Sequence, residues 1–244
     1  MSGHSKWATI KRKKEKTDAA KGKVFTKIVR ELAVAVKEGG GPDPNMNPRL
    51  RDTIAKAKAS NMPNDNIDRA IKKASGELGN INYENITYEG YGVGGVAVII
   101  DVLTDNKNRT AAEVRHALSK NGGSLGTTGC VAWMFDAKGV ITVEADGKVD
   151  EEALMMTALE AGAEDFSAEE GIYEILTDPS DFSQVREALE EAGYRFLSAE
   201  TDKIPQTTVQ LTPEQQESVF AMLDMLDDND DVQNVYHNAQ LDEE

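Results

Sequence analysis

The sequence predicts an α+β protein, built from a helical N-terminal domain of three helices and two small α/β units of the ferredoxin-like type. Apolar residues recur at helical spacing through the first eighty residues, whereas solid apolar strands alternate with amphipathic helices after residue 78. At 244 residues the chain also exceeds the ~100–150 residues of a usual single domain. Two or three small domains are therefore expected.

The N-terminal domain is expected to contain three helices. The first is predicted to end at Gly39, because its apolar residues follow the spacing of one helical face: Phe25, Ile28, Val29, Leu32 and Val36. Pro48 follows Asn47 at a position where helices accept proline, which predicts the start of a second helix. A third apolar stripe stops at Gly76. Residues 1–22 are polar and basic and are predicted to form an extended arm or a marginal helix.

The rest of the chain is predicted to repeat a unit of strand, cap and helix. Its clearest strand covers residues 96–103. Helices are expected near residues 111–120, 182–191 and 214–226. Thr110 with Glu113, and Thr212 with Gln215, have the spacing of capping boxes and place two of the helix starts. Repetition of this size favours two split β-α-β units over one large doubly wound sheet.

Charge is divided unevenly along the chain. Residues 1–80 carry 18 basic and 9 acidic residues, a net charge of +9, and the remainder carries 9 and 34, a net charge of −25. A basic head on an acidic body attracts phosphate at one end and orients the protein as it docks. The distribution predicts a nucleic-acid partner, although the whole chain has a net charge of −16.

The residues predicted to contact nucleic acid lie at and near the N-terminus. Between Lys6 and Lys27 only Glu15 and Asp18 are acidic, whereas a solvated surface helix usually mixes signs. Clustered cations release condensed counterions when they neutralise phosphates, and Trp7 offers a ring that can stack on a base. The candidate contacts are His4, Lys6, Trp7, Lys11, Arg12, Lys13, Lys14, Lys16, Lys21, Lys23, Lys27 and Arg30. A solvated charged face and a nuclear-localisation signal are the alternatives.

A second candidate contact lies in the polar segment before the helix expected near residue 111. Asn106, Asn108 and Arg109 precede this helix, and the backbone N–H groups at a helix N-terminus can bind an anion. Capping accounts for Thr110, but it does not account for Arg109. We therefore expect Asn106, Asn108 and Arg109 to contact an anion or a partner.

Two segments match ligand-binding motifs only in part. Residues 90–95 fit the pattern G-x-G-x-x-G, but they lead into a strand, whereas the dinucleotide motif follows a strand and opens a helix. A tight turn, or a close backbone approach to a ligand, is expected instead. Residues 227–231 imitate half of a calcium loop, but Val232 stands where glycine is required and Asn238 where glutamate is required. An acidic turn is therefore predicted.

The sequence contains no pattern of a catalytic, metal-binding or membrane-spanning protein. The three histidines are scattered, and no zinc-site or nucleophile-elbow spacing exists. The longest apolar run, residues 96–100, is far shorter than the ~20 residues of a membrane span. A single cysteine, Cys130, fits a reducing compartment. We expect a cytoplasmic, non-enzymatic protein without a cofactor, a bound metal or a small-molecule substrate.

Four strings of the sequence resemble the YebC family, which includes the mitochondrial translational activator of cytochrome c oxidase subunit one. They are MSGHSKW at residues 1–7, NMP at 61–63, YEGYG at 88–92 and TDNKNRT at 104–110. The strings are long and dispersed, and the resemblance covers nearly the whole chain. One departure is Val93, where the family pattern has proline between two glycines, and this loosens the expected turn.

The resemblance implies a division into three domains. Residues 1–80 form a basic helical domain, residues 81–130 and 206–240 together form a discontinuous α/β domain, and residues 131–205 form a third domain inserted into the second. The repeated units of strand and helix agree with this division.

The resemblance also implies a nucleic-acid-binding regulator of gene expression, in one of two forms. Some members are described as ribosome-associated factors that help translation, and others as probable transcriptional regulators that bind DNA. A flexible aromatic arm suits structured RNA, and flanking duplex phosphates repel an acidic body. Ribosomal RNA or the ribosome is therefore the favoured partner, and duplex DNA is the alternative. A more distant alternative is an interaction module that binds a basic protein through the acidic body.

Overall fold

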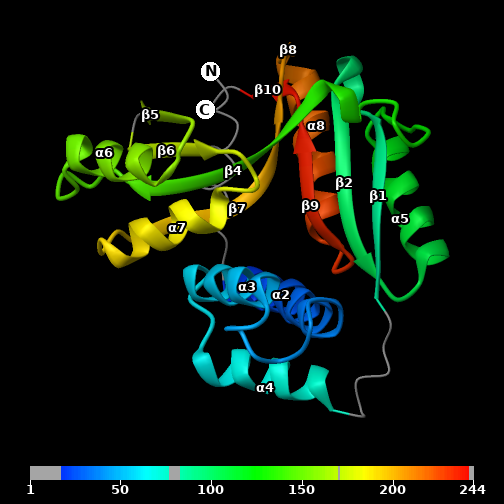
Figure 1. Cartoon of the computed structure of the whole chain (residues 1–244). Helices are drawn as coiled ribbons and strands as arrows, with labels where there is room; N and C mark the ends of the chain where they lie inside the picture. The colour runs from blue at the N-terminus through cyan, green and yellow to red at the C-terminus, as the bar shows by residue number, and fades with distance from the viewer. Residues whose placement is uncertain (1–17, 77–82, 170, 242–244) are drawn as a thin grey trace.

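A computed structural model describes residues 18–76, 83–169 and 171–241 of the chain (Figure 1). Within these residues, a head of three helices lies at one end of a body that contains two four-stranded antiparallel sheets. The predicted α+β class is therefore confirmed. None of the described helices is long and apolar enough to cross a membrane.

The head consists of α2 (Asp18–Glu38), α3 (Pro48–Ala59) and α4 (Asn64–Ser75). All three predicted helices are present, although α2 begins at Asp18, inside the segment predicted as an arm or a marginal helix. Ile28 and Leu32 of α2 are buried against Leu50 of α3 and Ile67 of α4. The head therefore has an apolar core of its own.

A buried asparagine joins α2 to α3. Asn47 Oδ1 accepts a hydrogen bond of 3.0 Å from the backbone N–H of Leu50 and thereby caps α3. Its Nδ2 donates to the carbonyl oxygens of Ala35 and Gly41, each at 2.8 Å. A side chain at Gly39 would collide with this amide. The predicted start of α3 is confirmed, and one side chain fixes both ends of the connection.

The first sheet of the body is assembled from two distant parts of the chain. Its strand order is β3-β1-β2-β9, and neighbouring strands are antiparallel. The strands are β1 (Glu84–Tyr91), β2 (Ala97–Thr104), β3 (Ser124–Leu125) and β9 (Val232–His237). Helices α5 (Lys107–Lys120) and α8 (Pro213–Asp227) cover one face, where they bury alternate residues of β2. A separate parallel pair joins β8 (Val209–Gln210) to β10 (Ala239–Gln240).

The glycine-rich segment between β1 and β2 is a tight turn, as predicted. It contains the short 3-10 helix η1 (Val93–Gly95), in which Gly94 and Gly95 have φ angles of 72° and 80°. Residues with a side chain rarely adopt this left-handed conformation. A Cβ atom at Gly94 would also meet the side chain of Leu211.

The second sheet is formed by one continuous stretch of chain. Its elements are β4 (Phe135–Glu144), α6 (Glu151–Ala161), β5 (Asp165–Glu169), β6 (Ile172–Thr177), α7 (Phe182–Glu191) and β7 (Phe196–Pro205). The antiparallel strand order β5-β6-β4-β7 and the order of elements are those of the ferredoxin-like fold. The chain leaves the first sheet after β3 and returns to it with α8 and β9, so this unit is inserted into the other. The exact domain bounds, 1–80, 81–130 with 206–240, and 131–205, remain a prediction.

The predicted start of α5 is wrong. The helix begins at Lys107 with Asn106 as its cap, because Asn106 Oδ1 accepts a hydrogen bond of 3.2 Å from the backbone N–H of Arg109. The hydroxyl of Thr110, the expected cap, is instead bonded to Asp231 at 2.7 Å. A tertiary contact thus uses the side chain that the local sequence pattern assigned to capping.

The predicted capping box of α8 is confirmed. Thr212 Oγ1 accepts from the backbone N–H of Gln215 at 3.4 Å, and Gln215 Oε1 accepts from that of Thr212 at 3.0 Å. Pro213 occupies the first turn, as the sequence predicts.

Candidate functional site: the junction of head and body

One side of α2 faces residues 227–231, which join the end of α8 to β9 and are called the acidic loop below. Lys23 Nζ lies 2.7 Å from Asp228 Oδ1, and Lys27 Nζ donates to the carbonyl oxygen of Asp227 at 3.1 Å. The pKa of Lys23 is raised, first by its hydrogen bond to Asp228. Basic residues of the head are therefore bonded to the body in this structure.

Asp231 is the centre of the junction. It is 3% exposed, and its carboxylate accepts from Arg30 at 2.5 Å, Arg109 at 2.6 Å, Thr110 at 2.7 Å and Thr104 at 3.1 Å. Burial acts to raise the pKa of Asp231, but the hydrogen bonds from these side chains outweigh burial and hold the pKa at about 2. The carboxylate is thus a charged link between the head and two segments of the body.

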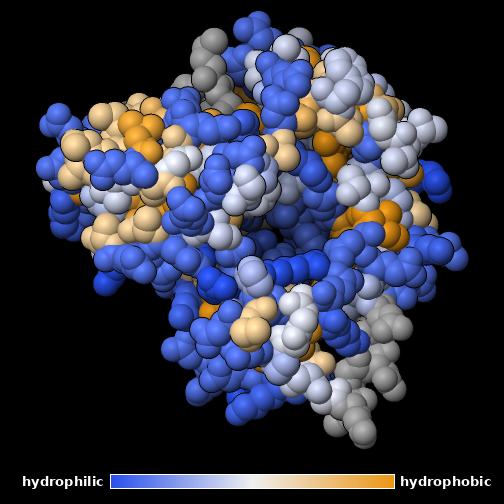
Figure 2. Space-filling view, viewed as in Figure 1, coloured by the Kyte–Doolittle hydropathy of each residue, from blue (hydrophilic) through white to orange (hydrophobic). Residues whose placement is uncertain are grey.

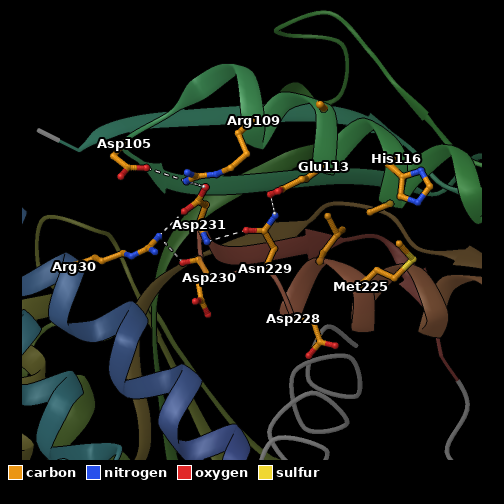
Figure 3. Close-up of a pocket in the computed structure, with 13 residues that line it drawn as sticks. Arg30, Asp105, Arg109, Glu113, His116, Met225, Asp228, Asn229, Asp230 and Asp231 are labelled. Carbon is orange, nitrogen blue, oxygen red and sulfur yellow. Dashed lines mark hydrogen bonds and ion pairs between the residues drawn. The ribbon is translucent and has the colours of Figure 1, made fainter. Parts of the chain in front are cut away.

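A groove of about 760 Å³ opens beside this network (Figure 3). Arg109, Glu113 and His116 line it from α5, and the acidic loop lines it from the opposite side. Asn229 Nδ2 donates to Glu113 Oε2 across the groove at 2.8 Å. Arg109 also bonds to Asp105 at 2.9 Å. The carboxylates that hold the arginines make this groove better suited to a cationic ligand than to a phosphate.

A second set of ion pairs joins α3 to the inserted unit. Arg186 of α7, whose side chain is 3% exposed, lies 3.2 Å from Asp52. Lys56 Nζ lies 2.9 Å from Glu31 and 3.5 Å from Glu200 of β7. Burial alone would lower the pKa of Lys56, but the two carboxylates raise it well above its ordinary value. The head is therefore bonded to both sheets of the body.

A polar cleft of about 330 Å³ lies between the head and the first sheet, where the space-filling view shows a hydrophilic recess (Figure 2). Lys203 lines it, with Nζ 2.5 Å from Asp101 Oδ2 and 4.8 Å from the ring centroid of Tyr236. The pKa of Tyr236 is raised, first by burial and then by neighbouring carboxylates. The lysines of this cleft are thus paired with acidic groups inside the chain.

The predicted contact residues fall into three groups. The first group lies outside the described residues, so the structure does not test it: His4, Lys6, Trp7, Lys11, Arg12, Lys13, Lys14 and Lys16. Lys21 belongs to α2, and Lys23, Lys27 and Arg30 face the acidic loop. The third group, Asn106, Asn108 and Arg109, lies at the exposed start of α5. Their roles in binding remain predictions.

Asp231 was not identified as special from the sequence, which predicted only an acidic turn at residues 227–231. Nothing local separates Asp231 from its neighbours except its place directly before β9, which begins with the buried Val232. Its partners come from α2, β2 and α5, so only the tertiary structure reveals its role.

The fold and the junction define a class of protein with a helical head, a discontinuous α/β domain and a ferredoxin-like insertion. The chain belongs to the TACO1/YebC family. The model described as the TACO1/YebC N-terminal domain matches residues 5–77, and the model of the second and third domains matches residues 83–239.

Individual relatives agree with this assignment. A protein of Acetivibrio thermocellus named probable transcriptional regulatory protein is 62% identical over 239 residues, which cover 98% of both chains. A protein of the same name from Caldicellulosiruptor bescii is 60% identical over 244 residues, 100% of both chains. The crystal structure of a conserved hypothetical protein from Aquifex aeolicus is similar with a TM-score of 0.84, at 46% identity and 94% coverage of both chains.

Proposed function

We propose that this protein is a non-enzymatic, nucleic-acid-binding regulator of gene expression that acts in the cytoplasm. The division of charge carries the proposal, since residues 1–80 have a net charge of +9 and the remainder a net charge of −25. The separate core of the head supports a discrete binding unit. The names of the relatives, probable transcriptional regulatory proteins, support a regulatory role.

Within this function we favour a ribosome-associated factor that binds structured RNA. Lys23, Lys27 and Arg30 contact the acidic loop, so the body's negative charge lies directly beside the middle of α2. A straight duplex held by the head would bring its flanking phosphates toward exposed Asp228 and Asp230. Folded RNA can curve around a small basic unit and avoid this repulsion.

Duplex DNA is the second candidate target, and the names of the relatives favour it. The acidic groove beside Asp231 leaves room for the third candidate, an interaction module that binds a basic protein. For both RNA and DNA, the head supplies the affinity and the body limits which shapes of nucleic acid can approach.

Sedimentation with ribosomes tests the choice of target. At moderate salt the full-length protein is expected to co-sediment with ribosomes, and purified ribosomes should displace it from random duplex DNA. Both interactions should weaken steeply as salt rises, because phosphate contacts release counterions. A protein that stays at the top of the gradient and protects a promoter selectively in a footprint would support the transcriptional candidate. Binding to neither nucleic acid would overturn the proposed function.

A further inference from the structure

The segment before β4 presents an exposed aromatic ring. Trp133 lies in the short 3-10 helix η2 (Ala132–Met134) and is 69% exposed. Its indole N–H donates to the carbonyl oxygen of Cys130 at 3.1 Å, and the hydroxyl of Tyr91 donates to the same oxygen at 3.2 Å. Tyr91 is itself 38% exposed. Two aromatic side chains, Tyr91 at the end of β1 and Trp133 in η2, thus donate hydrogen bonds to one oxygen atom, and part of each ring surface is exposed to solvent.

A buried carboxylate holds this loop in place. Glu89 is 4% exposed and accepts hydrogen bonds from the backbone N–H groups of Gly129 at 2.6 Å, Val131 at 2.9 Å and Ala132 at 2.8 Å. Burial acts to raise the pKa of Glu89, but these three bonds outweigh it and lower the pKa. Charge-assisted bonds to three backbone N–H groups within residues 129–132 order the segment directly before Trp133. The ring is therefore presented on a rigid support.

The surroundings of the ring favour a planar, uncharged ligand. Residues 126–133 contain no charged side chain. Apart from Tyr91, the other exposed large apolar residues of the described chain lie in the head and in α6: Val24, Val29, Met46, Met156 and Leu159. A protein-binding hot spot is normally enclosed by further packed contacts, which small Gly, Thr and Ala neighbours do not supply. Stacking on a nucleobase needs only a ring face, because every base has a π surface.

We propose that Trp133, with Tyr91 beside it, stacks on an unpaired base of the bound nucleic acid. This inference rests on the proposed function, and it names the class of target as nucleic acid with unpaired nucleotides. It also assigns a binding role to the acidic body, which the charge distribution alone gives only to the head.

The distance between the Trp133 ring and the head limits which nucleic acids can contact both. The loop is bonded to the end of β1 at Glu89 and Tyr91, whereas Arg30 of the head contacts the opposite end of β2 at Leu103. Tyr91 pairs with Ala97 at the start of β2, and the six residue steps from Ala97 to Leu103 span roughly 20 Å at ~3.4 Å per residue. A folded RNA can offer phosphates to the head and a looped-out base to Trp133 at that separation. A continuous duplex has no unpaired base to offer.

Fluorescence of a single indole tests the proposal in the full-length chain. The sequence has two tryptophans, so Trp7→Phe leaves Trp133 as the only indole. The probes are an RNA hairpin with an unpaired loop and a fully paired RNA duplex of equal length. The hairpin is expected to quench Trp133 fluorescence, and the duplex is not. Trp133→Ala should weaken hairpin binding roughly 5- to 150-fold, the range of one lost base–aromatic stack, and Trp133→Phe should retain most of the affinity.

Matched controls separate this inference from the proposed function. Met156→Ala removes another exposed apolar side chain, 55% exposed on α6, and should leave hairpin affinity unchanged. If salt-dependent binding persists but Trp133→Ala binds the hairpin as wild type does, or if the duplex quenches equally, the stacking proposal is overturned and the proposed function stands. Quenching by ribosomal proteins free of RNA, and not by the hairpin, also overturns it. A chain that binds no nucleic acid at any salt concentration overturns both.

Discussion

At the scale of single residues, Asp231 connects the head to the body. Among residues 227–231 it is the one that is buried, and it accepts from Arg30 of the head and from Arg109 of α5. Arg30 is itself largely buried, with a side chain 18% exposed. Removing one partner of a buried ion pair leaves the other charge without compensation, which costs more than the pair contributes as a whole.

We expect Asp231→Asn to lower the free energy of unfolding by about 3 kcal/mol at neutral pH, because two arginines lose their shared carboxylate. The effect should depend on pH. The folded pKa of about 2 lies below the ordinary value of 3.8, so the charged carboxylate stabilises the fold fully above pH ~4 and loses this contribution as pH falls through ~2. The difference in Tm between wild type and variant should therefore shrink between pH ~5 and ~2, as calorimetry can measure.

Asp230→Asn is the matched control, because Asp230 is the exposed neighbour and only its backbone carbonyl accepts from Arg30. Its Tm should stay close to that of wild type across the same pH range. A constant gap between wild type and Asp231→Asn at every pH would show that the charge of Asp231 is not what stabilises the junction.

At the scale of secondary-structure elements, local chemistry determined which helices the sequence could predict. The starts of α3 and α8 followed from Pro48 and Pro213, whose missing N–H is not needed in a first helical turn. The start of α5 could not be predicted in this way, because both Asn106 and Thr110 are good caps. Which of them caps the helix depends on Asp231, which lies 121 residues from Thr110 along the chain and binds its hydroxyl. The ordered position of Trp133 could not be predicted either, because Glu89 of β1, far away in the sequence, accepts the hydrogen bonds that hold its loop.

Asn47 gives an element-scale prediction. We expect Asn47→Ala to lower the free energy of unfolding by roughly 2 kcal/mol or more, because it removes the cap of α3 and leaves the buried carbonyl oxygen of Ala35 and the partly buried one of Gly41 without this donor. Urea denaturation of the full chain measures the change. Asn45→Ala in the same loop is the control, since Asn45 is exposed and bonds to Asp43 through its backbone N–H. Equal effects of the two variants would contradict the capping role.

At the scale of the whole molecule, the sequence predicted the separation of charge but not how the two parts face each other. A count of residues places a net charge of +9 in residues 1–80, and it treats every lysine of that stretch as equally available. The folded chain directs Lys23 and Lys27 toward the acidic loop, where Asp228 and the carbonyl of Asp227 hold them. The run of four cations at residues 11–14 is therefore the stronger candidate for phosphate contact.

Salt titration tests this ranking of the basic residues. We expect the change of Lys11, Arg12, Lys13 and Lys14 to glutamine to weaken nucleic-acid binding and to flatten the log–log salt slope by roughly 3 units, at ~0.7–0.9 per phosphate contact. The paired control is Lys23→Gln with Lys27→Gln, which removes cations already bonded within the chain. Per charge removed, the control should flatten the slope less, because phosphate would have to displace the acidic loop before reaching these lysines. Equal flattening per charge in the two variants would mean that the junction between head and body opens when nucleic acid binds. An unchanged slope for the four-residue variant would mean that residues 11–14 form a solvated surface that does not contact phosphate.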